Sequence, residues 1–341
     1  MNKQYLDYLA LKTEHPHLYA RDLAAMMGLS EAELTLIRCG HDAHSLQPEF
    51  EALLKGLAAV GEIKSLVRND YAVHEQIGRY ENLHFGPHAG LVLNPRALDQ
   101  RFFPQQWQSV FALTELSATG ERQSVQIFDA QGDAVVKIYA IPQTDAAAWQ
   151  ALVSQWQQVA PTTLALQPRP AVTEPTDIDS HTVEQEWRAM TDVHQFFQLL
   201  RRHQLTRQHA FQLVSDDLAR QVSNDSFALL LERVQQQQNE IMIFVGNRGC
   251  TQIFTGRLAK VVEMKGWLNI FNDQFTLHLQ DKKIAETWIT RKPTKDGHVT
   301  SLELFAEDGT QIAQLYGQRT EGQPEQEMWR QQLEELAGVL C

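Results

Sequence analysis

The feature that most constrains how this chain can fold is an internal repeat. Residues 128–139 align without a gap on residues 305–316, an offset of 177 positions, and the two runs share Phe, Gly and Tyr at matching places. Self-similarity at a fixed offset indicates duplication, so we expect two copies of one supersecondary unit. Flanking residues keep the same or almost the same spacing: Phe111 matches Trp288, Asn69 matches Asn247, and Trp149 matches Trp329.

Within each copy, the pattern predicts helices, then an antiparallel sheet, then a closing helix. In the first copy, Gly28 can end one helix and the capping box Ser30-x-x-Glu33 begins the next. Short β-rich runs separated by Gly-bearing turns predict an antiparallel meander at residues 111–116, 124–128 and 134–139. Residues 145–158 carry an apolar stripe at helical spacing. The predicted fold class is therefore α+β, a tandem repeat in which each half is an antiparallel sheet flanked by helices.

A proline-rich stretch separates the two copies. Residues 161–180 contain four prolines and few apolar residues, which is typical of a semi-extended linker. We therefore predict an N-terminal repeat at 1–160, a linker at 161–180 and a C-terminal repeat at 181–341.

Composition excludes several classes of protein. With 43% hydrophobic and 21% charged residues, the chain is typical of soluble globular proteins. A formal net charge of −12 disfavours a nucleic-acid ligand. Three widely spaced cysteines indicate a reducing compartment. The N-terminus has no apolar signal-peptide core, and no run approaches the roughly 18 apolar residues of a membrane span. We expect a cytoplasmic protein that is not inserted into a membrane.

Two local patterns suggest other functions. Residues 21–34 have the sequence pattern of a helix-turn-helix motif, but the second predicted helix carries glutamates and no basic residue. Such a face is unsuited to phosphates, so we favour a helical hairpin packed on a sheet over a DNA-binding regulator. Cys39, His41 and His44 lack a partner pair at zinc-site spacing, which disfavours a structural metal.

The stretch after the linker, residues 187–202, carries the chemistry. Trp187, Met190, His194, Phe197 and Arg201 recur at helical spacing, which predicts one face of a single helix. An imidazole among aromatic rings and guanidinium groups fits a flat, apolar, iron-bearing dianion. Taken alone, the same pattern also fits a hydrogen-bonded histidine on a core helix.

Four ordered motifs resemble the bacterial HemS-type family of hemin-degrading and heme-transport factors, in its two-repeat form. They span nearly the whole chain and include Met-Thr-Asp-Val-His194-x-Phe-Phe. The others are Asn94-Pro-Arg-Ala-Leu-Asp-Gln-Arg101-Phe-Phe103, Phe244-Val-Gly-Asn-Arg-Gly-Cys250 and Gln314-Leu-Tyr316-Gly-Gln-Arg319-Thr-Glu-Gly322.

The resemblance implies a heme in a cleft between the halves and a role for several residues. His194 would be the axial iron ligand, and Arg101 would lie over the opposite iron face as the second catalytic residue. Cations for the propionates would come from Arg207, Lys292 and Arg319. Hydrogen-bonding neighbours would be Gln314 and Tyr316, and the aromatic rings that pack on the macrocycle would be Phe103 and Phe244.

The implied function is heme-iron acquisition: the protein would accept imported hemin, with an inner-membrane heme transporter as donor. We favour oxidative opening of the porphyrin ring to release iron. The sequence has no Gly-rich nucleotide loop or redox cysteine pair, so an external electron donor is expected. The alternative is a non-enzymatic heme chaperone that passes hemin to a separate oxygenase, because both functions need the same pocket.

Overall fold

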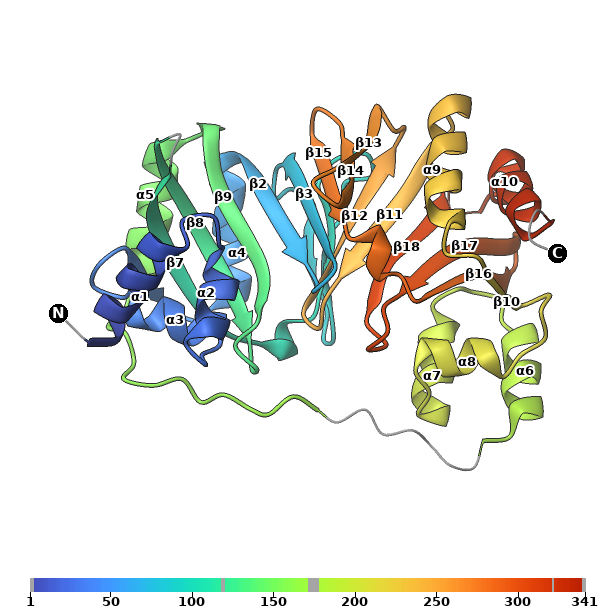
Figure 1. Cartoon of the computed structure of the whole chain (residues 1–341), viewed down its shortest axis with the longest axis horizontal. Coiled ribbons are helices and arrows are strands. Elements are labelled where there is room, and N and C mark those ends of the chain that lie inside the picture. The colour runs from blue at the N-terminus through green and yellow to red at the C-terminus, as the bar shows by residue number, and fades with distance from the viewer. Residues whose placement is uncertain (1–2, 118–119, 171–177, 321, 339–341) are drawn as a thin grey trace. The chain divides into compact units, whose positions relative to one another are not determined.

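The computed structural model describes residues 3–117, 120–170, 178–320 and 322–338 (Figure 1). The elements of the first half are α1 (Lys3–Glu14), α2 (Ala20–Met26), α3 (Glu31–Ile37), β1 (Ala43–Leu46), α4 (Phe50–Gly56), η1 (Leu57–Val60), β2 (Gly61–Arg68), β3 (Ala72–Gly78), β4 (Leu83–Phe85), β5 (Gly90–Val92), β6 (Asp99–Phe102), η2 (Pro104–Gln106), β7 (Trp107–Ser117), β8 (Gly120–Asp129), β9 (Ala134–Thr144) and α5 (Ala146–Trp156). Residues 171–177 of the predicted linker lie outside the described residues.

The second half repeats this order. Its elements are α6 (Ser180–Arg188), α7 (Gln195–His203), α8 (Arg207–Gln212), β10 (Ala219–Val222), α9 (Ser226–Gln237), β11 (Ile241–Gly246), β12 (Cys250–Gly256), β13 (Lys260–Met264), β14 (Trp267–Phe271), β15 (Phe275–Leu279), η3 (Asp281–Lys283), β16 (Glu286–Thr294), β17 (Gly297–Phe305), β18 (Gln311–Gly317) and α10 (Glu327–Gly338). Strand β8 and strand β17 begin 177 residues apart, as the internal repeat predicts. The predicted duplication and the α+β class are confirmed.

The strands form two nine-stranded sheets, in the orders β1-β7-β8-β9-β2-β3-β15-β14-β13 and β10-β16-β17-β18-β11-β12-β6-β5-β4. The predicted meander is present, since β7, β8 and β9 pair antiparallel in sequence. Strands β16, β17 and β18 repeat it. Each meander has a bulge near the end of its middle strand, between Ile127 and Phe128 in one copy and between Leu304 and Phe305 in the other.

The chain divides into two compact units, each made of three segments. Unit 1 comprises Met1–Arg68, Glu75–Pro170 and Asn247–Gln252, and unit 2 comprises Asn69–His74, Ala171–Gly246 and Ile253–Cys341. The matched asparagines hold the two short segments. In unit 2, Asn69 donates to the carbonyls of Gly246 and Ile312 at 3.2 and 3.0 Å. In unit 1, Asn247 donates to the carbonyls of Arg68 and Val135 at 3.0 and 2.9 Å.

Unit 2 has helices on both faces of its strands (Figure 1). Helices α9 and α10 cover one face, where Leu230 and Trp329 pack against Leu302. Helices α6, α7 and α8 cover the other face, where Trp187, Phe196 and Phe211 form an aromatic core with Trp288. Trp187 is fully buried, and its indole N–H donates to the carbonyl of Arg291 at 2.9 Å. Burying such a ring contributes about 3 kcal/mol or more, so α6 is firmly anchored to β16.

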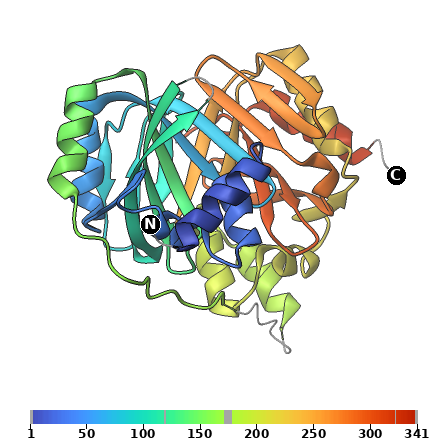
Figure 2. The same cartoon turned by 60° about the vertical axis from the view of Figure 1, so that its left-hand side comes forward.

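Unit 1 follows the same plan, with α1 to α3 on one face and α4 and α5 on the other (Figure 2). The predicted capping box of α3 is present, since Ser30 and Glu33 bind each other's backbone N–H groups. Ala32 is fully buried against Phe111 and Phe128, so α3 packs on the sheet as the hairpin prediction requires.

The single helix predicted over residues 187–202 is wrong. Helix α6 ends at Arg188 and α7 begins at Gln195, because two side chains bind the intervening backbone. Gln195 Oε1 accepts from the N–H groups of Thr191 and Asp192, at 2.8 and 3.3 Å, and Asp192 Oδ1 accepts from the N–H of His194 at 2.8 Å. Local bonds of this kind compete with the helical ladder. The break leaves Trp187 in the core and His194 on the surface.

Candidate functional site

One face of the unit 2 sheet gathers most of the predicted site residues. Ser301 is opposite Tyr316 and Glu303 is opposite Gln314 in the β17–β18 pairing, while Phe244 is opposite Gln314 in the β11–β18 pairing. Side chains alternate along a strand, so these residues share the face that α6 to α8 cover. Arg207, the first residue of α8, joins them through an ion pair with Glu303.

His194 lies at the start of α7, with its side chain 82% exposed. Its Nδ1 is 2.7 Å from Asp192 Oδ1, the same oxygen that accepts its backbone N–H. The backbone bond from His194, above all, lowers the pKa of Asp192, with the imidazole adding to it. Asp192 is therefore a carboxylate, which can only accept, so the imidazole donates to it from Nδ1. With the proton on Nδ1, Nε2 can offer its lone pair to a metal ion.

The surface around His194 combines a ring and cations. Phe197, one helical turn along α7, is 59% exposed, which is unusual for so large an apolar side chain. Arg201 continues the exposed stripe. Arg319 is half-buried just after β18, close enough to Asp192 for its charge to lower the pKa of that carboxyl. The face of α7 therefore keeps the predicted imidazole, aromatic ring and guanidinium groups together.

Two of the three predicted propionate cations are bound to a buried carboxylate. Arg207 Nε and Nη2 each donate to Glu303 at 2.8 Å. Lys292 Nζ donates to Glu303 Oε1 at 2.9 Å and to Thr290 Oγ1 at 2.6 Å, and its side chain is 2% exposed. Glu303 is fully buried, so this carboxylate already neutralises charge on both cations.

The pKa values in this cluster follow from its charges. Burial alone would raise the pKa of Glu303, but Arg207 and Lys292 outweigh burial and hold it well below its usual range. Burial lowers the pKa of Lys292 to about 8; Glu303 opposes that shift and Arg207 adds to it. Glu303 is therefore firmly ionised, and it needs both cations to remain so in the core.

A chain of hydrogen bonds runs from this cluster along the sheet. Tyr316 donates to Gln314 at 2.9 Å, Gln314 donates to Gln311 at 2.6 Å, and Gln311 donates to Glu303 at 2.8 Å. Burial, followed by the charge of Glu303, raises the pKa of Tyr316. The ring of Phe244 meets Tyr316 edge-on, with centroids 5.2 Å apart. Gln314, Tyr316 and Phe244 thus form an ordered polar and aromatic wall.

Arg101 and Phe103 belong to unit 1. Arg101 lies on β6, forms an ion pair with Asp99 and donates to the carbonyl of Gln100 at 3.0 Å. Phe103 follows that strand and is 37% exposed. The predicted cleft between the halves, and the placement of Arg101 over the iron, stay predictions.

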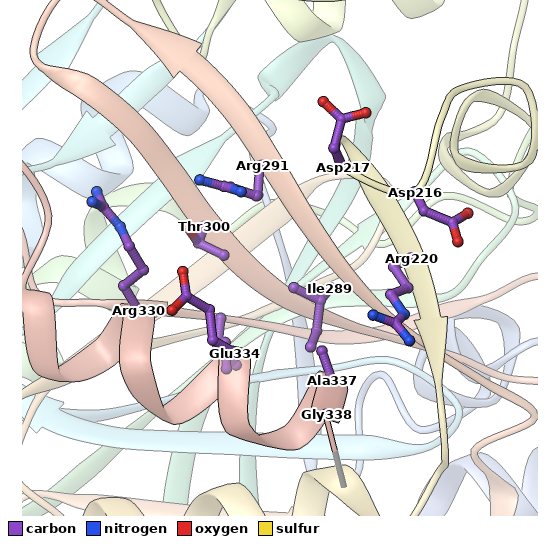
Figure 3. Close-up of a pocket in the computed structure, with 11 residues that line it drawn as sticks. Asp216, Asp217, Arg220, Ile289, Arg291, Thr300, Arg330, Glu334, Ala337 and Gly338 are labelled. Carbon is purple, nitrogen blue, oxygen red and sulfur yellow. The ribbon is translucent and has the colours of Figure 1, made fainter. Parts of the chain in front are cut away.

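A cavity of about 410 Å³ in unit 2 opens on the other face of the sheet, between α10 and strands β10 and β16 (Figure 3). Ile289 and Leu333 are among the residues that line it, and Arg291 and Arg330 lie at one end. Ile289 alternates with Thr290, which faces the Glu303 cluster, so the cavity and the His194 surface are separated by the sheet. None of the predicted site residues lines it.

Within the described ranges, no group of three or more His, Cys, Asp or Glu side chains is arranged to hold a metal ion. No helix in the described part of the chain is long and apolar enough to cross a membrane.

The model of the haemin-degrading HemS.ChuX domain matches this chain twice, at residues 28–156 and 204–336. The chain belongs to this family. The two matches fall one in each copy of the repeat and together cover most of the sequence.

Relatives match along nearly their whole length. The hemin transport protein HmuS of Yersinia pestis is 62% identical over 336 residues, covering 97% of this chain and 96% of the relative. The heme-degrading enzyme ChuS of Escherichia coli O157:H7 superposes with a TM-score of 0.93 at 58% identity, covering 97% of this chain and 98% of that one. The holo form of PhuS, a heme-binding protein from Pseudomonas aeruginosa, superposes with a TM-score of 0.94 at 38% identity, with 97% of each chain covered.

Sequence reasoning assigned no role to three residues that organise this face. Asp192 lies inside the motif that contains His194, and Glu303 and Gln311 lie outside the four family motifs. A signal for Glu303 existed, because it lies between Leu302 and Leu304 in its strand, and a glutamate that is buried must be paired.

Proposed function

We propose that this protein binds hemin through His194 on unit 2 and opens the porphyrin ring with an external reductant, releasing iron. The observation that carries the proposal is the state of His194. Its ring is exposed, held at Nδ1 by Asp192 and free at Nε2, beside Phe197 and Arg319. Histidine nitrogen is a usual axial ligand of heme iron.

Each neighbouring group has a task toward a bound macrocycle. Phe197 offers an apolar ring to the porphyrin plane, and Arg319 offers a charge to a propionate. Arg207 and Lys292 keep Glu303 compensated and so hold the wall of Gln314 and Tyr316 in place, instead of binding a propionate with their full charge. We accordingly assign the propionate contact chiefly to Arg319.

Ring opening is favoured by the relatives. ChuS, at 58% identity, is described both as a heme-degrading enzyme and as a heme oxygenase. The iron of a bound heme would supply the redox chemistry, while this chain would supply the axial nitrogen, the apolar surface and the cations. Arg101 is the chain's candidate for orienting groups on the other side of the iron, since a guanidinium offers several donors in a fixed plane. An inner-membrane heme transporter is the expected source of hemin and a separate protein or small molecule the electron donor.

A heme carrier is the second candidate. The two curated relatives, at 62% and 61% identity, are both named hemin transport proteins, and PhuS is described as heme-binding. The same His194 surface would serve a protein that passes hemin on unchanged.

One experiment separates the two functions. The full-length protein is reconstituted with one equivalent of hemin and given a reductant and air, with catalase present to remove free peroxide. Ring opening predicts loss of the Soret band, a tetrapyrrole product of altered mass and release of iron to a chelator. Intact hemin recovered with several suitable reductants, with and without oxygen, would refute the enzymatic function and leave the carrier.

A further inference from the structure

We propose that Asp192 is the positioning residue for His194: it fixes which imidazole nitrogen faces the iron and strengthens that nitrogen as a ligand. This inference rests on the proposed hemin site. Asp192 would touch neither the hemin nor the iron and would act through His194.

The contact is specific in its geometry. A single oxygen, Asp192 Oδ1, accepts both the His194 backbone N–H at 2.8 Å and the imidazole Nδ1 at 2.7 Å. The first bond fixes the backbone of the ligand and the second fixes the rotation of its ring. An exposed histidine has many rotamers. These two hydrogen bonds therefore remove conformational freedom that hemin binding would otherwise have to remove.

The backbone that carries Asp192 is itself held by hydrogen bonds. The side chain of Gln195 accepts from the N–H of Thr191 at 2.8 Å and from the N–H of Asp192 at 3.3 Å. The carbonyl of Thr191 also accepts from the N–H of Lys295 at 3.0 Å, which ties the turn to the end of the β16–β17 hairpin. Although His194 and Asp192 are both exposed, the turn that carries them is therefore anchored to the sheet.

The matching turn of unit 1 lacks this arrangement. The residue 177 positions before His194 is His17, which also lies in the turn between two helices, α1 and α2. The residues between α1 and α2, 15–19, include no acid. Both turns therefore contain histidine, but the nearest histidine–carboxylate contact in unit 1 is Glu14 Oε1 at 3.9 Å from His15 Nε2, whereas Asp192 Oδ1 lies 2.7 Å from His194 Nδ1.

The chemical consequence follows from the charge. A carboxylate that accepts Nδ1–H makes the opposite nitrogen a stronger electron donor and orients it, as outer ligand partners do at other metal sites. Stronger donation favours the ferric over the ferrous state. Asp192 should thus raise hemin affinity and lower the midpoint potential of the bound iron.

The test is Asp192→Asn in the full-length protein, measured with hemin. Asparagine has the same shape and keeps an oxygen for Nδ1–H, but it loses the charge. We expect hemin affinity to fall about tenfold, at the lower end of the range for such partners because the site is exposed. The midpoint potential should rise, and the iron–histidine stretching frequency of the reduced complex should decrease.

Two controls isolate the effect. Asp225→Asn removes another exposed aspartate of unit 2, one that makes no side-chain capping bond, and should change none of these readouts. In a His194→Ala background, Asp192→Asn should also have no effect, since it acts only through the imidazole.

If Asp192→Asn leaves affinity, potential and stretching frequency unchanged while His194→Ala removes the axial signal, the positioning role is refuted and the hemin site stands. An effect of Asp192→Asn that persists without His194 also refutes it, because the carboxylate would then act on hemin directly. If His194→Ala itself keeps the axial signal, the proposed ligand fails and the role of Asp192 fails with it.

Discussion

Each repeat has a buried ion pair between a helix and a strand of its sheet, but the acidic and basic residues are exchanged between the two repeats. In unit 2, a strand supplies the acid, Glu303, and helix α8 supplies the cation, Arg207. In unit 1, a strand supplies the cation, Lys137, and helix α3 supplies the acid, Glu31. The position that matches Glu303 in unit 1 is Gln126, which binds Ser124 at 3.0 Å.

This difference shows which requirement belongs to the fold and which to the site. The fold needs a compensated pair between helix and sheet, and either arrangement of signs provides it. In unit 2 the carboxylate of Glu303 binds a second cation, Lys292, whereas in unit 1 the carboxylate with two cations is a different one, Glu115, which binds Arg38 and Arg122. The turn histidine of unit 2, His194, has an aspartate beside it. The asymmetry favours unit 2 as the half that holds the iron ligand.

Removing the acid from each ion pair should lower the unfolding free energy more than any other change considered, and the loss should be larger in unit 2 than in unit 1. Glu303→Gln leaves two buried cations without their carboxylate, so we expect a loss of about 3–5 kcal/mol in unfolding free energy. Glu31→Gln leaves Lys137, which keeps some contact with solvent, and should cost about 1–3 kcal/mol. Urea denaturation of both variants measures the difference. Equal losses would show that the second cation adds nothing to the unit 2 cluster.

Substitutions at Arg101 and at the matching position of unit 2, His278, test whether Arg101 acts in ring opening. Arg101→Lys keeps a positive charge beside Asp99 but loses the planar donor fork. We expect hemin still to bind, while ring opening slows about a hundredfold, by analogy with lost catalytic donors worth about 2.7–4 kcal/mol. His278, which lies 177 positions later on β15, is the matched control, and His278→Ala should retain the rate. Turnover near that of the original protein in Arg101→Lys would remove Arg101 from the catalytic step.

Replacing Arg319 should change the affinity for hemin more than the spectrum of the bound iron. A charged contact to a propionate is worth about 1.5–3 kcal/mol, and the lower value applies at a half-buried site. Arg319→Gln should therefore weaken hemin binding about tenfold and leave the axial spectrum unchanged. Arg257→Gln, at another unit 2 arginine, is the control. If Arg319→Gln binds hemin as tightly as the control, the propionate assignment is wrong.

Acid should reduce the difference between the original protein and Glu303→Gln. The folded-state pKa of Glu303 lies below its ordinary value of 4.5, so its stabilising effect is present above pH 4.5 and is lost as the pH falls below it. The stability gap between the two proteins should shrink by up to about 1.4 kcal/mol per pH unit in that range. A gap that stays constant from pH 6 to about pH 3 would contradict the depressed pKa.

The fold could be predicted from the sequence because it depends on patterns of local residue spacing. The offset between Phe128 and Phe305, the capping box at Ser30 and the alternating strands all depend on local spacing, and the structure confirms them. The helix over 187–202 failed for a local reason as well. Helical periodicity continued across Thr191 and Asp192, while side-chain bonds to the backbone ended α6 there.

The site was less accessible because its contacts join residues far apart in the chain. Lys292 and Arg207 were predicted to bind the heme propionates, yet both bind Glu303, a residue whose burial depends on the packing of α8 over the sheet. No spacing rule links positions 207, 292 and 303. His194 could be proposed from its motif, but its ring orientation required the structure.

The most direct test of the account compares His194→Ala with His17→Ala, a histidine of the α1–α2 turn in unit 1, by titrating each variant with hemin. The account predicts that His194→Ala shifts the Soret band and weakens binding by roughly a hundredfold or more, beyond the typical effect of losing an outer partner. His17→Ala should match the original protein in spectrum and affinity. An unchanged Soret band and affinity in His194→Ala would contradict the assignment of the iron ligand to unit 2.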